Sequence, residues 1–547
     1  MPIPSALAPD TILTNGHILT VNAAFDVVTA LASRDGRIIA TGDDAEVAAL
    51  AGTATRRIDL GGRTVLPGLI DAHCHMLTTG LLLGDIVLHD CRTVPEVLSR
   101  VATRAAQTPP GIWLVGRGWD ESVLAEGRPP SRAELDEVAP YNPVCLHRVG
   151  NKLMANSAAL AVAGIDRHSP DPDQTQPYAG SFDRDADGEP TGLFRDRAKD
   201  LITRHIPPPT LATKAAALGR VSRAFNALGL VGAADPGLYP DDLRAYQRAR
   251  QEGALTIRSA LCLAGWGFGS AAWEPQIGPW IESLGVGGDF GDDRLWFDAV
   301  KLMVDGGIGD RTAALHEPYP GGDERGQFIV AEETLPELVR WCHDRGWPVE
   351  SHVCGDRAQD AVVAAYAAAY AASPAGRPLR HRIHHAYLPT PATLALMARH
   401  DIPAILNPPF LHYMGESFVA ALGAERAGRM KPARRYLDAG VALAGSSDST
   451  VSDYNPFVGI WTMIARRTLT GRELGPDQRL TRPEAIRLYT SGAAYALRRE
   501  RHWGALEPGK WADLVVLDRD ILTCPEEQIK AIRPLQTWLG GEIVFEA

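Results

Sequence analysis

Eight short apolar runs, separated by helix-like stretches, constrain the fold of this chain more than any other feature of its sequence. Because the runs and the helix-like stretches alternate, their β-then-α order predicts a parallel sheet, and eight strands in that order predict closure into a barrel. The expected fold is an α/β protein built on a (β/α)8 TIM-like barrel. The eight runs are residues 64–71, 230–235, 255–262, 295–304, 348–352, 382–386, 403–407 and 442–447.

Two further parts are expected outside this pattern. Short β-rich runs at both ends of the chain predict one small β-sandwich domain shared by residues 1–63 and 504–547. The barrel is expected over residues 64–503, but the interval between its first two strands is too long for a loop. We therefore expect an inserted subdomain over residues 80–228, above the active-site mouth of the barrel, where it would select the substrate.

Composition limits the partners and the compartment. The 547 residues are 45% hydrophobic and 22% charged, which is typical of a folded globule rather than a disordered chain. The net charge of -11 and the lack of a dense basic cluster argue against a nucleic-acid partner. With no secretory signal, no apolar run of membrane-spanning length and no C-x-x-C pair, the sequence favours a soluble, cytoplasmic protein that acts on a small molecule. Barrels with such a terminal domain often form homodimers, although nothing in this sequence shows a dimer.

The first apolar run leads into LIDAHCHM, which carries two histidines one residue apart. At the end of a strand this spacing points the imidazoles of His73 and His75 to the same face, while Cys74 points away. Two such imidazoles can bind one metal ion, and the carboxyl ends of the strands are where barrel active sites are assembled. The alternative is that two polar residues simply close the strand.

Four more candidate ligands occupy the same relative place on other strands. Lys301 lies near the end of the fourth run, His352 ends the fifth, His385 lies at the end of the sixth and Asp448 follows the eighth. Nitrogen and carboxylate ligands without cysteine suit a catalytic divalent metal, Zn²⁺ or else Mn²⁺, Co²⁺ or Fe²⁺.

Lys301 is the unusual member of this set, because an ammonium group has no lone pair and repels a cation. One interpretation is a solvated or salt-bridged lysine. In the other, burial deprotonates the amine, which then reacts with carbon dioxide to give N6-carboxylysine, whose two oxygens can bridge two metals.

Five motifs carry a specific resemblance. TVLPGLIDAHCHM, VKLMVDGGIGDRTA, SHVCGDRA, RIHHA and GSSDS stand in the order and spacing of the amidohydrolase superfamily. The chain resembles most the amidohydrolase-3 branch, which includes N-substituted formamide deformylases and YtcJ-like proteins. NSAALAVAGI and GEPTGLFRD in the insertion resemble that branch in particular, and GALEPGKWADLVVLD resembles the C-terminal signature of such hydrolases.

The resemblance implies a metal-dependent hydrolase that cleaves a carbon–nitrogen bond of the amide type, as in an N-substituted formamide or a hydrophobic aryl or alkyl amide. Lys301 would bridge two metals, of which the more buried is held by the two histidines of the first strand and Asp448. In RIHHA the pattern favours His385, and alternation then predicts His384 on the opposite face. The implied ligands for one or two metals are His73, His75, Lys301, His352, His385 and Asp448.

The expected mechanism is attack by metal-activated hydroxide, with Asp448 accepting the proton and delivering it to the departing amine. A rival is deamination of a heterocycle, but such enzymes usually carry a glutamate where this chain has Gly355. A second rival is a metal-free scaffold, although such relatives typically lose ligands that this chain retains.

Several residues near the motifs keep two interpretations. Asp305 and Arg311 are either loop supports or substrate contacts, and Asp356 is more often a helix N-cap than a catalyst. Four aromatic side chains either line an apolar substrate pocket or pack between insertion and barrel: Trp113, Trp119, Trp266 and Phe268.

Overall fold

The chain forms two compact units in the computed structural model, and the second is inserted into the first. They are Met1–Thr79 with Leu218–Ala547, and Gly80–Ala217. Within the part of the chain that is described, no helix is both long and apolar enough to cross a membrane. The described residues are 8–148, 152–172, 180–268, 273–373 and 379–547.

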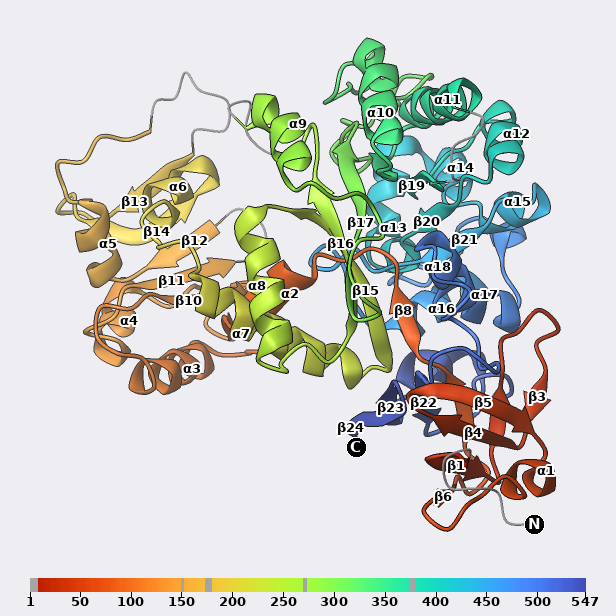
Figure 1. Cartoon of the computed structure of the whole chain (residues 1–547). Helices are drawn as coiled ribbons and strands as arrows, with labels where there is room; N and C mark the ends of the chain where they lie inside the picture. The colour runs from red at the N-terminus through yellow and green to blue at the C-terminus, as the bar shows by residue number, and fades with distance from the viewer. Residues whose placement is uncertain (1–7, 149–151, 173–179, 269–272, 374–378) are drawn as a thin grey trace. The chain divides into compact units, whose positions relative to one another are not determined.

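The larger unit contains a sheet of eight parallel strands that closes into a barrel (Figure 1). Sequential strands are neighbours throughout, and the amide of Ala72 donates a hydrogen bond of 3.1 Å to the carbonyl of Gly445, which joins the first strand to the last. The predicted α/β barrel is confirmed. Its strands are β8 (Leu69–Asp71), β15 (Leu230–Leu238), β16 (Arg258–Ala264), β17 (Leu295–Met303), β18 (Val349–Val353), β19 (Arg382–His385), β20 (Ala404–Leu406) and β21 (Leu443–Gly445).

Helices follow the strands, and α10, α11 and α12 lie along the outer side of the barrel (Figure 1). Every residue of β15 and β16 is buried, as expected for strands that pack on the barrel interior at one face and on helices at the other. The helices are α7 (Leu211–Asn226), α8 (Pro240–Gln251), α9 (Glu274–Ser283), α10 (Leu335–Asp344), α11 (Asp356–Ala372), α12 (Pro391–His400), α13 (Pro408–Leu422), α14 (Ala424–Gly428), α15 (Ala433–Asp438), α16 (Pro456–Ala465), α17 (Arg482–Leu488) and α18 (Ser491–Ala496); α2 (Met76–Leu82) follows β8.

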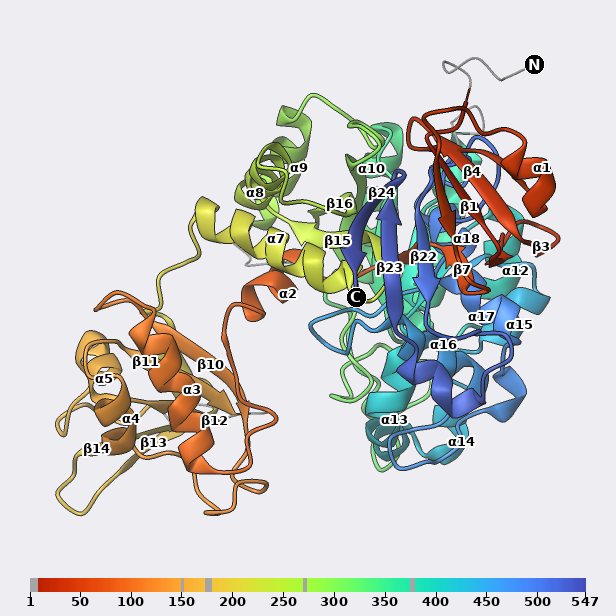
Figure 2. The ribbon, with the colours of Figure 1, turned by 90° about the horizontal axis from the view of Figure 1, so that it is seen from below.

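The two ends of the chain build the predicted β-sandwich, and their strands lie side by side in Figure 2. One sheet has the order β5-β4-β1-β6 and the other β24-β23-β22-β7-β2-β3, and apolar side chains from both form one core. The bounds are β1 (Thr11–Thr14), β2 (His17–Leu19), β3 (Val27–Val28), β4 (Ala30–Arg34), β5 (Arg37–Gly42), α1 (Asp44–Ala48), β6 (Arg56–Asp59), β7 (Thr64–Pro67), β22 (Leu514–Leu517), β23 (Pro534–Leu539) and β24 (Glu542–Glu546).

The first apolar run, residues 64–71, is divided between two sheets rather than forming one barrel strand. Thr64–Pro67 is β7, which pairs with β22 and β2 of the sandwich, and only Leu69–Asp71 enters the barrel. Gly68 marks the break, where a Cβ would lie 2.4 Å from a methyl group of Val231. Assigning the whole run to the barrel was wrong, because a continuous apolar stretch does not reveal where a chain passes from one sheet to the next.

The inserted unit contains a mixed six-stranded sheet with apolar side chains on both faces. Along β11 and β12 the side chains alternate between two cores, so that Leu146 and Met154 belong to one and Cys145 and Leu153 to the other. Helices α3 and α4 contribute apolar side chains to the first core, and α5 and α6 contribute them to the second. The elements are β9 (Ile86–Val87), α3 (Val94–Ala106), β10 (Leu114–Trp119), α4 (Arg132–Val138), β11 (Val144–Arg148), β12 (Lys152–Ala155), α5 (Ser157–Ala163), β13 (Ser181–Arg184), β14 (Pro190–Arg195) and α6 (Asp200–Thr203).

Candidate metal centre

Three of the predicted ligands meet where β8 and β21 end. The Nε2 atoms of His73 and His75 each lie 3.4 Å from Oδ1 of Asp448. The backbone fixes this meeting, because the amide of Asp448 donates to the carbonyl of His73 at 2.9 Å and the amide of His75 donates to the carbonyl of Ser449 at 2.6 Å. Two imidazoles therefore converge on one carboxylate oxygen.

Two further predicted ligands form a second group at the ends of β18 and β19. The ring centroids of His352 and His385 lie 4.2 Å apart. Cys354 joins them, with its Sγ 3.4 Å from Nε2 of His352, and the three residues offer ligand atoms within 4.8 Å of one another. The sequence interpretation missed Cys354, although its position two residues after His352 at the end of a strand was the available signal.

Lys301 lies on β17 and is 1% exposed. Its Nζ is 3.5 Å from Oε1 of Glu350 and 3.5 Å from Nδ1 of His384. Burial lowers the pKa of the Lys301 amine, and the negative charges of Glu350 and Asp448 oppose that shift. The lysine is thus enclosed within the histidine cluster rather than solvated.

Alternation predicted His384 on the opposite face from His385, but the structure places its ring in the histidine cluster. Its ring stacks on that of His73 with centroids 3.3 Å apart, and it is 4.0 Å from the ring of His385. Strict alternation fails because His385 has a φ of 72°, which turns the strand out of its pleat at its last residue. Both histidines of RIHHA therefore reach the cluster.

Asn407, which follows β20, fixes the orientation of both histidines. Its Oδ1 accepts a hydrogen bond of 2.8 Å from Nδ1 of His385, which leaves Nε2 of that ring available to a ligand. Its Nδ2 donates to Nε2 of His384 at 3.0 Å, so that neutral His384 carries its proton on Nδ1, the atom that faces Lys301. One buried amide thus sets the tautomers of two neighbouring rings.

A buried ionic network lies behind His73. Glu350 accepts a hydrogen bond from Nδ1 of His73 and receives Nε and Nη2 of Arg382 at 2.8 and 2.5 Å. Arg382 also bonds Asp298 at 2.5 Å. Burial acts to raise the pKa of Glu350, but Arg382 and then His73 and Lys301 hold it well below its usual range. Glu350 therefore remains ionised and leaves Nε2 of His73 free, which is the arrangement that orients metal-binding histidines.

The protonation states of His352, His385 and Asp448 fit a divalent cation. Burial lowers the pKa of His352 to about 3 and that of His385 well below its usual value, so both rings are neutral near pH 7. Burial opposes ionisation of Asp448, but the neighbouring imidazoles of His73 and His75 hold its pKa well below the usual range. Neutral imidazole and ionised carboxylate are the forms in which these groups bind Zn²⁺ and related metals.

Asp305, Asp356 and Arg311, which the sequence left with two interpretations each, all bond to the backbone of loops. Asp305 is fully buried and accepts hydrogen bonds of 2.8 to 2.9 Å from the amides of Ala314, Cys354 and Gly355. Asp356 is the first residue of α11 rather than its N-cap, and it accepts from the amide of His316 at 2.8 Å. Arg311 donates to the carbonyl of Pro320 and lies over the ring of Tyr319.

The four aromatic side chains have different environments. Trp119 is buried in the inserted unit, where its indole N–H donates to the carbonyl of Leu146 at 2.9 Å, and Trp113 packs in the second core of the same unit. Trp266 packs against Trp341. Phe268 alone of the four lies near the cluster, with its ring stacked 6.4 Å from that of His75.

Comparisons with known proteins show the family of this chain. A sequence model of the amidohydrolase family matches residues 56–545. YtcJ of Bacillus subtilis (strain 168), a protein named as an amidohydrolase, is 30% identical over 97% of this chain and 98% of its own length. The N-substituted formamide deformylase of Arthrobacter pascens is also 30% identical, over 98% of each chain. The crystal structure of an uncharacterized metal-dependent hydrolase from Pyrococcus furiosus superposes with a TM-score of 0.75 at 26% identity, covering 94% of this chain and all of that one. The chain belongs to the amidohydrolase family.

Proposed function

We propose that this protein is a metal-dependent hydrolase of a small molecule and that it cleaves a carbon–nitrogen bond of the amide type, in an N-substituted formamide or a hydrophobic aryl or alkyl amide. The convergence of His73, His75 and Asp448 at the carboxyl ends of the barrel strands carries this proposal. The family membership and the similarity to a formamide deformylase over nearly the whole chain support the substrate class.

In this proposal the cluster holds one or two divalent ions, with zinc the expected metal. A bound divalent cation supplies a Lewis acid for a carbonyl oxygen and makes water acidic enough to react near neutral pH. His73, His75 and Asp448 would hold one ion, and His352 and His385 a second. Cys354 would lie beside the second ion without being required as a ligand.

Lys301 would join the two ions as N6-carboxylysine. Two features support this over a salt-bridged ammonium: the amine is buried with a lowered pKa, and the neighbouring Nδ1 of His384 carries a proton that an ammonium group cannot accept. A carbamate offers oxygens to that proton. Glu350 at 3.5 Å favours the ammonium instead, so the state of Lys301 is set by the competition between carbon dioxide and this carboxylate.

Asp448 is proposed as the group that accepts a proton from the attacking water and transfers it to the departing amine. Its carboxylate is held by two imidazoles at 3.4 Å, and its own amide is bonded to the backbone of His73. A carboxylate fixed in this way keeps one orientation through both proton transfers, which general acid–base catalysis requires. The products are a carboxylate, or formate, and an amine.

Gly355 disfavours the rival reaction, deamination of an amino-substituted heterocycle. A Cβ at this position would lie 1.8 Å from the carbonyl oxygen of Ala314, a backbone atom. The glutamate that serves as proton carrier in such deaminases therefore has no room here.

The test is a hydrolysis screen of the metal-loaded protein over N-substituted formamides, aryl amides, carbamates and cyclic amides, with amine release as the readout. We expect turnover of one amide-type class. Ammonia release from nucleobases or related heterocycles, with no amine release from any amide, would contradict the proposal and restore the deaminase alternative.

A further inference from the structure

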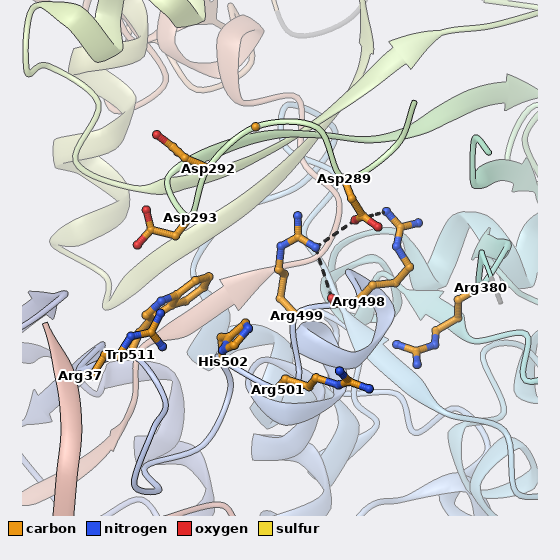
Figure 3. A pocket seen from close by; sticks show the side chains of 11 residues that line it. Arg37, Asp289, Asp292, Asp293, Arg380, Arg498, Arg499, Arg501, His502 and Trp511 are labelled. Atoms are coloured by element: carbon orange, nitrogen blue, oxygen red, sulfur yellow. Dashed lines mark hydrogen bonds and ion pairs between the residues drawn. The ribbon is translucent and has the colours of Figure 1, made fainter. Parts of the chain in front are cut away.

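A cavity of about 600 Å³ lies at the end of the barrel opposite the metal cluster. Its walls come from the loop that leads into β17, from Arg380 just before β19, from the segment after α18 and from the sandwich (Figure 3). The predicted ligands on β17 and β19, Lys301 and His385, lie at the other ends of the same strands. The cavity is therefore separate from the candidate metal centre.

Arginine dominates the lining of this cavity, in a chain whose net charge is -11. Five arginines and His502 face three aspartates. The positive lining favours an anionic ligand. Among side chains, the guanidinium group is best suited to bind carboxylates and phosphates, because it offers paired N–H donors. The arginines are Arg37, Arg380, Arg498, Arg499 and Arg501.

The three aspartates are already engaged by arginines. Asp293 pairs at 3.1 Å with Arg258, a buried residue outside the lining of this cavity. Asp292 pairs with Arg250 at 3.3 Å and accepts two backbone amides that hold the turn before β17. Asp289 receives both Arg498 at 2.9 Å and Arg499 at 3.0 Å (Figure 3). The carboxylates of the cavity thus do not neutralise all of its cations.

Three arginines keep donors for a ligand. Arg501 is exposed and makes no hydrogen bond or ion pair with any residue in the described ranges. Among the described residues, the side chain of Arg37 donates only through Nη1, to the carbonyl of Gly509 at 2.9 Å. In the same ranges the side chain of Arg499 donates only through Nη1, to Asp289 and to the carbonyl of Arg498, and its guanidinium lies over the ring of Trp296. The Nη2 groups of these two side chains bond no carboxylate within the part of the chain that is described.

The pKa of His502 reflects the positive charges around it. Partial burial, and after it the positive charges of Arg37, Arg499, Arg501 and Lys510, lower the pKa of this imidazole. The charged side chains that act most on the ring are thus all cations. Trp511 forms an apolar wall, but Arg258 covers one of its faces at 3.7 Å, which leaves little room for stacking a planar ligand. The cavity suits a compact anion rather than an aromatic one.

We propose that this cavity binds a small, multiply charged oxyanion, the phosphate of a phosphate ester or the carboxylates of a dicarboxylic acid, with Arg37, Arg499 and Arg501 among the lining residues that donate to it. The ligand would be a second small molecule, distinct from the substrate of the metal centre. Its binding requires neither a metal ion nor the amide chemistry.

The proposal is tested by titration calorimetry of the full-length protein with inorganic phosphate and with succinate, at fixed ionic strength, with chloride as the monovalent comparison. We expect saturable binding of one or both anions at one site per chain. Binding of phosphate alone would assign a phosphate ester, and binding of succinate alone a dicarboxylate. Arg501→Gln and Arg37→Gln should each weaken binding by about tenfold, the loss of one charge-assisted contact.

Arg57→Gln is the matched control, because it removes the same charge from an exposed position in β6 outside the cavity. It should change the affinity by less than about twofold. Absence of saturable binding for both anions up to about 10 mM would overturn the proposal. So would binding that persists unchanged in Arg501→Gln and Arg37→Gln, because that result would place the anion elsewhere, such as at the metal centre.

Discussion

At the scale of single residues, Asp448 is the point on which the two histidines of the first strand converge. It follows β21, and His73 and His75 follow β8, yet all three ligand groups lie within 4.8 Å of one another. If Asp448 carries the proton, Asp448→Asn should keep the shape of the site while removing the base. We expect kcat to fall by about 10²- to 10⁴-fold with metal still bound, as measured by steady-state kinetics and metal analysis on the same sample. Near-normal turnover with full metal occupancy would exclude Asp448 from this role.

Glu350 contacts His73, and we expect it to act through that ring rather than on the substrate. Glu350→Gln removes the negative charge that holds Nδ1 of His73 and that pairs with Arg382. We expect metal affinity to fall by about 10- to 100-fold, as measured by competition with a chelator, because groups that orient a metal-binding histidine contribute to affinity to this extent. The control is Glu333→Gln, an exposed glutamate in the turn before α10, which should leave affinity unchanged. Equal affinities in the two variants would refute the positioning role.

The sequence revealed the ligand candidates but not the groups that orient them. His73, His75, His352 and His385 could be recognised because each lies at a strand end in a polar motif. Glu350 and Arg382 could not, since their pairing depends on the register of β18 and β19, in which they lie opposite each other. No local pattern in a single sequence specifies the register between strands that are about 30 residues apart.

At the scale of elements, the turn from β18 into α11 depends on Gly355. A methyl group there would meet the backbone of Ala314 at 1.8 Å, and Asp305 ties the same two segments together. Gly355→Ala should therefore cost about 1 to 3 kcal/mol of unfolding free energy. It should also lower activity, because His352 lies three residues before Gly355, near the end of β18. Gly287→Ala is the control, since its Cβ would meet nothing closer than 3.5 Å. Equal denaturation midpoints for the two variants would contradict this account.

The NSAALAVAGI segment of the inserted unit has a structural explanation. Asn156 caps α5 through a 3.0 Å hydrogen bond from the amide of Ala159, accepts from the amide of Val144 at 2.8 Å, and donates to two carbonyls before β11. Asn156→Ala should destabilise the unit Gly80–Ala217 by about 2 to 4 kcal/mol, because it leaves several buried groups unpaired. Asn156→Asp keeps the hydrogen-bond acceptor but loses the donor. Its loss of stability should therefore lie between zero and that of Asn156→Ala. Unfolding traces by calorimetry that coincide with wild type would argue against this role.

The sequence predicts strands well where burial on both faces makes them largely apolar, as in β15 and β16. Prediction failed where one such run changed sheets at Gly68, and where His385 left the pleat with a positive φ. Both failures have the same cause. The hydrophobic pattern indicates burial, but it does not encode the backbone angles that set where a chain passes from one sheet to another or where a side chain at a strand end points.

At the scale of the whole molecule, the order of elements in one chain yields a barrel, a sandwich shared by both termini and an insertion after the first barrel strand. The role of the insertion in substrate selection stays a prediction. The sequence does not predict the arginine-lined cavity, because its arginines are scattered from Arg37 to Arg501 and only the fold gathers them. The residues of the candidate metal centre are likewise brought together only by the fold, and the proposed function requires them to hold a metal ion.

The most direct test of the account is therefore the metal content of the purified full-length protein, measured by inductively coupled plasma mass spectrometry together with amine release before and after chelation. We predict one to two equivalents of a divalent metal per chain, principally zinc, loss of amine release when the metal is removed, and recovery when Zn²⁺ or Mn²⁺ is restored. A protein that purifies without divalent metal, takes none up and gains no hydrolytic activity on its addition would contradict the central claim and favour a non-enzymatic scaffold.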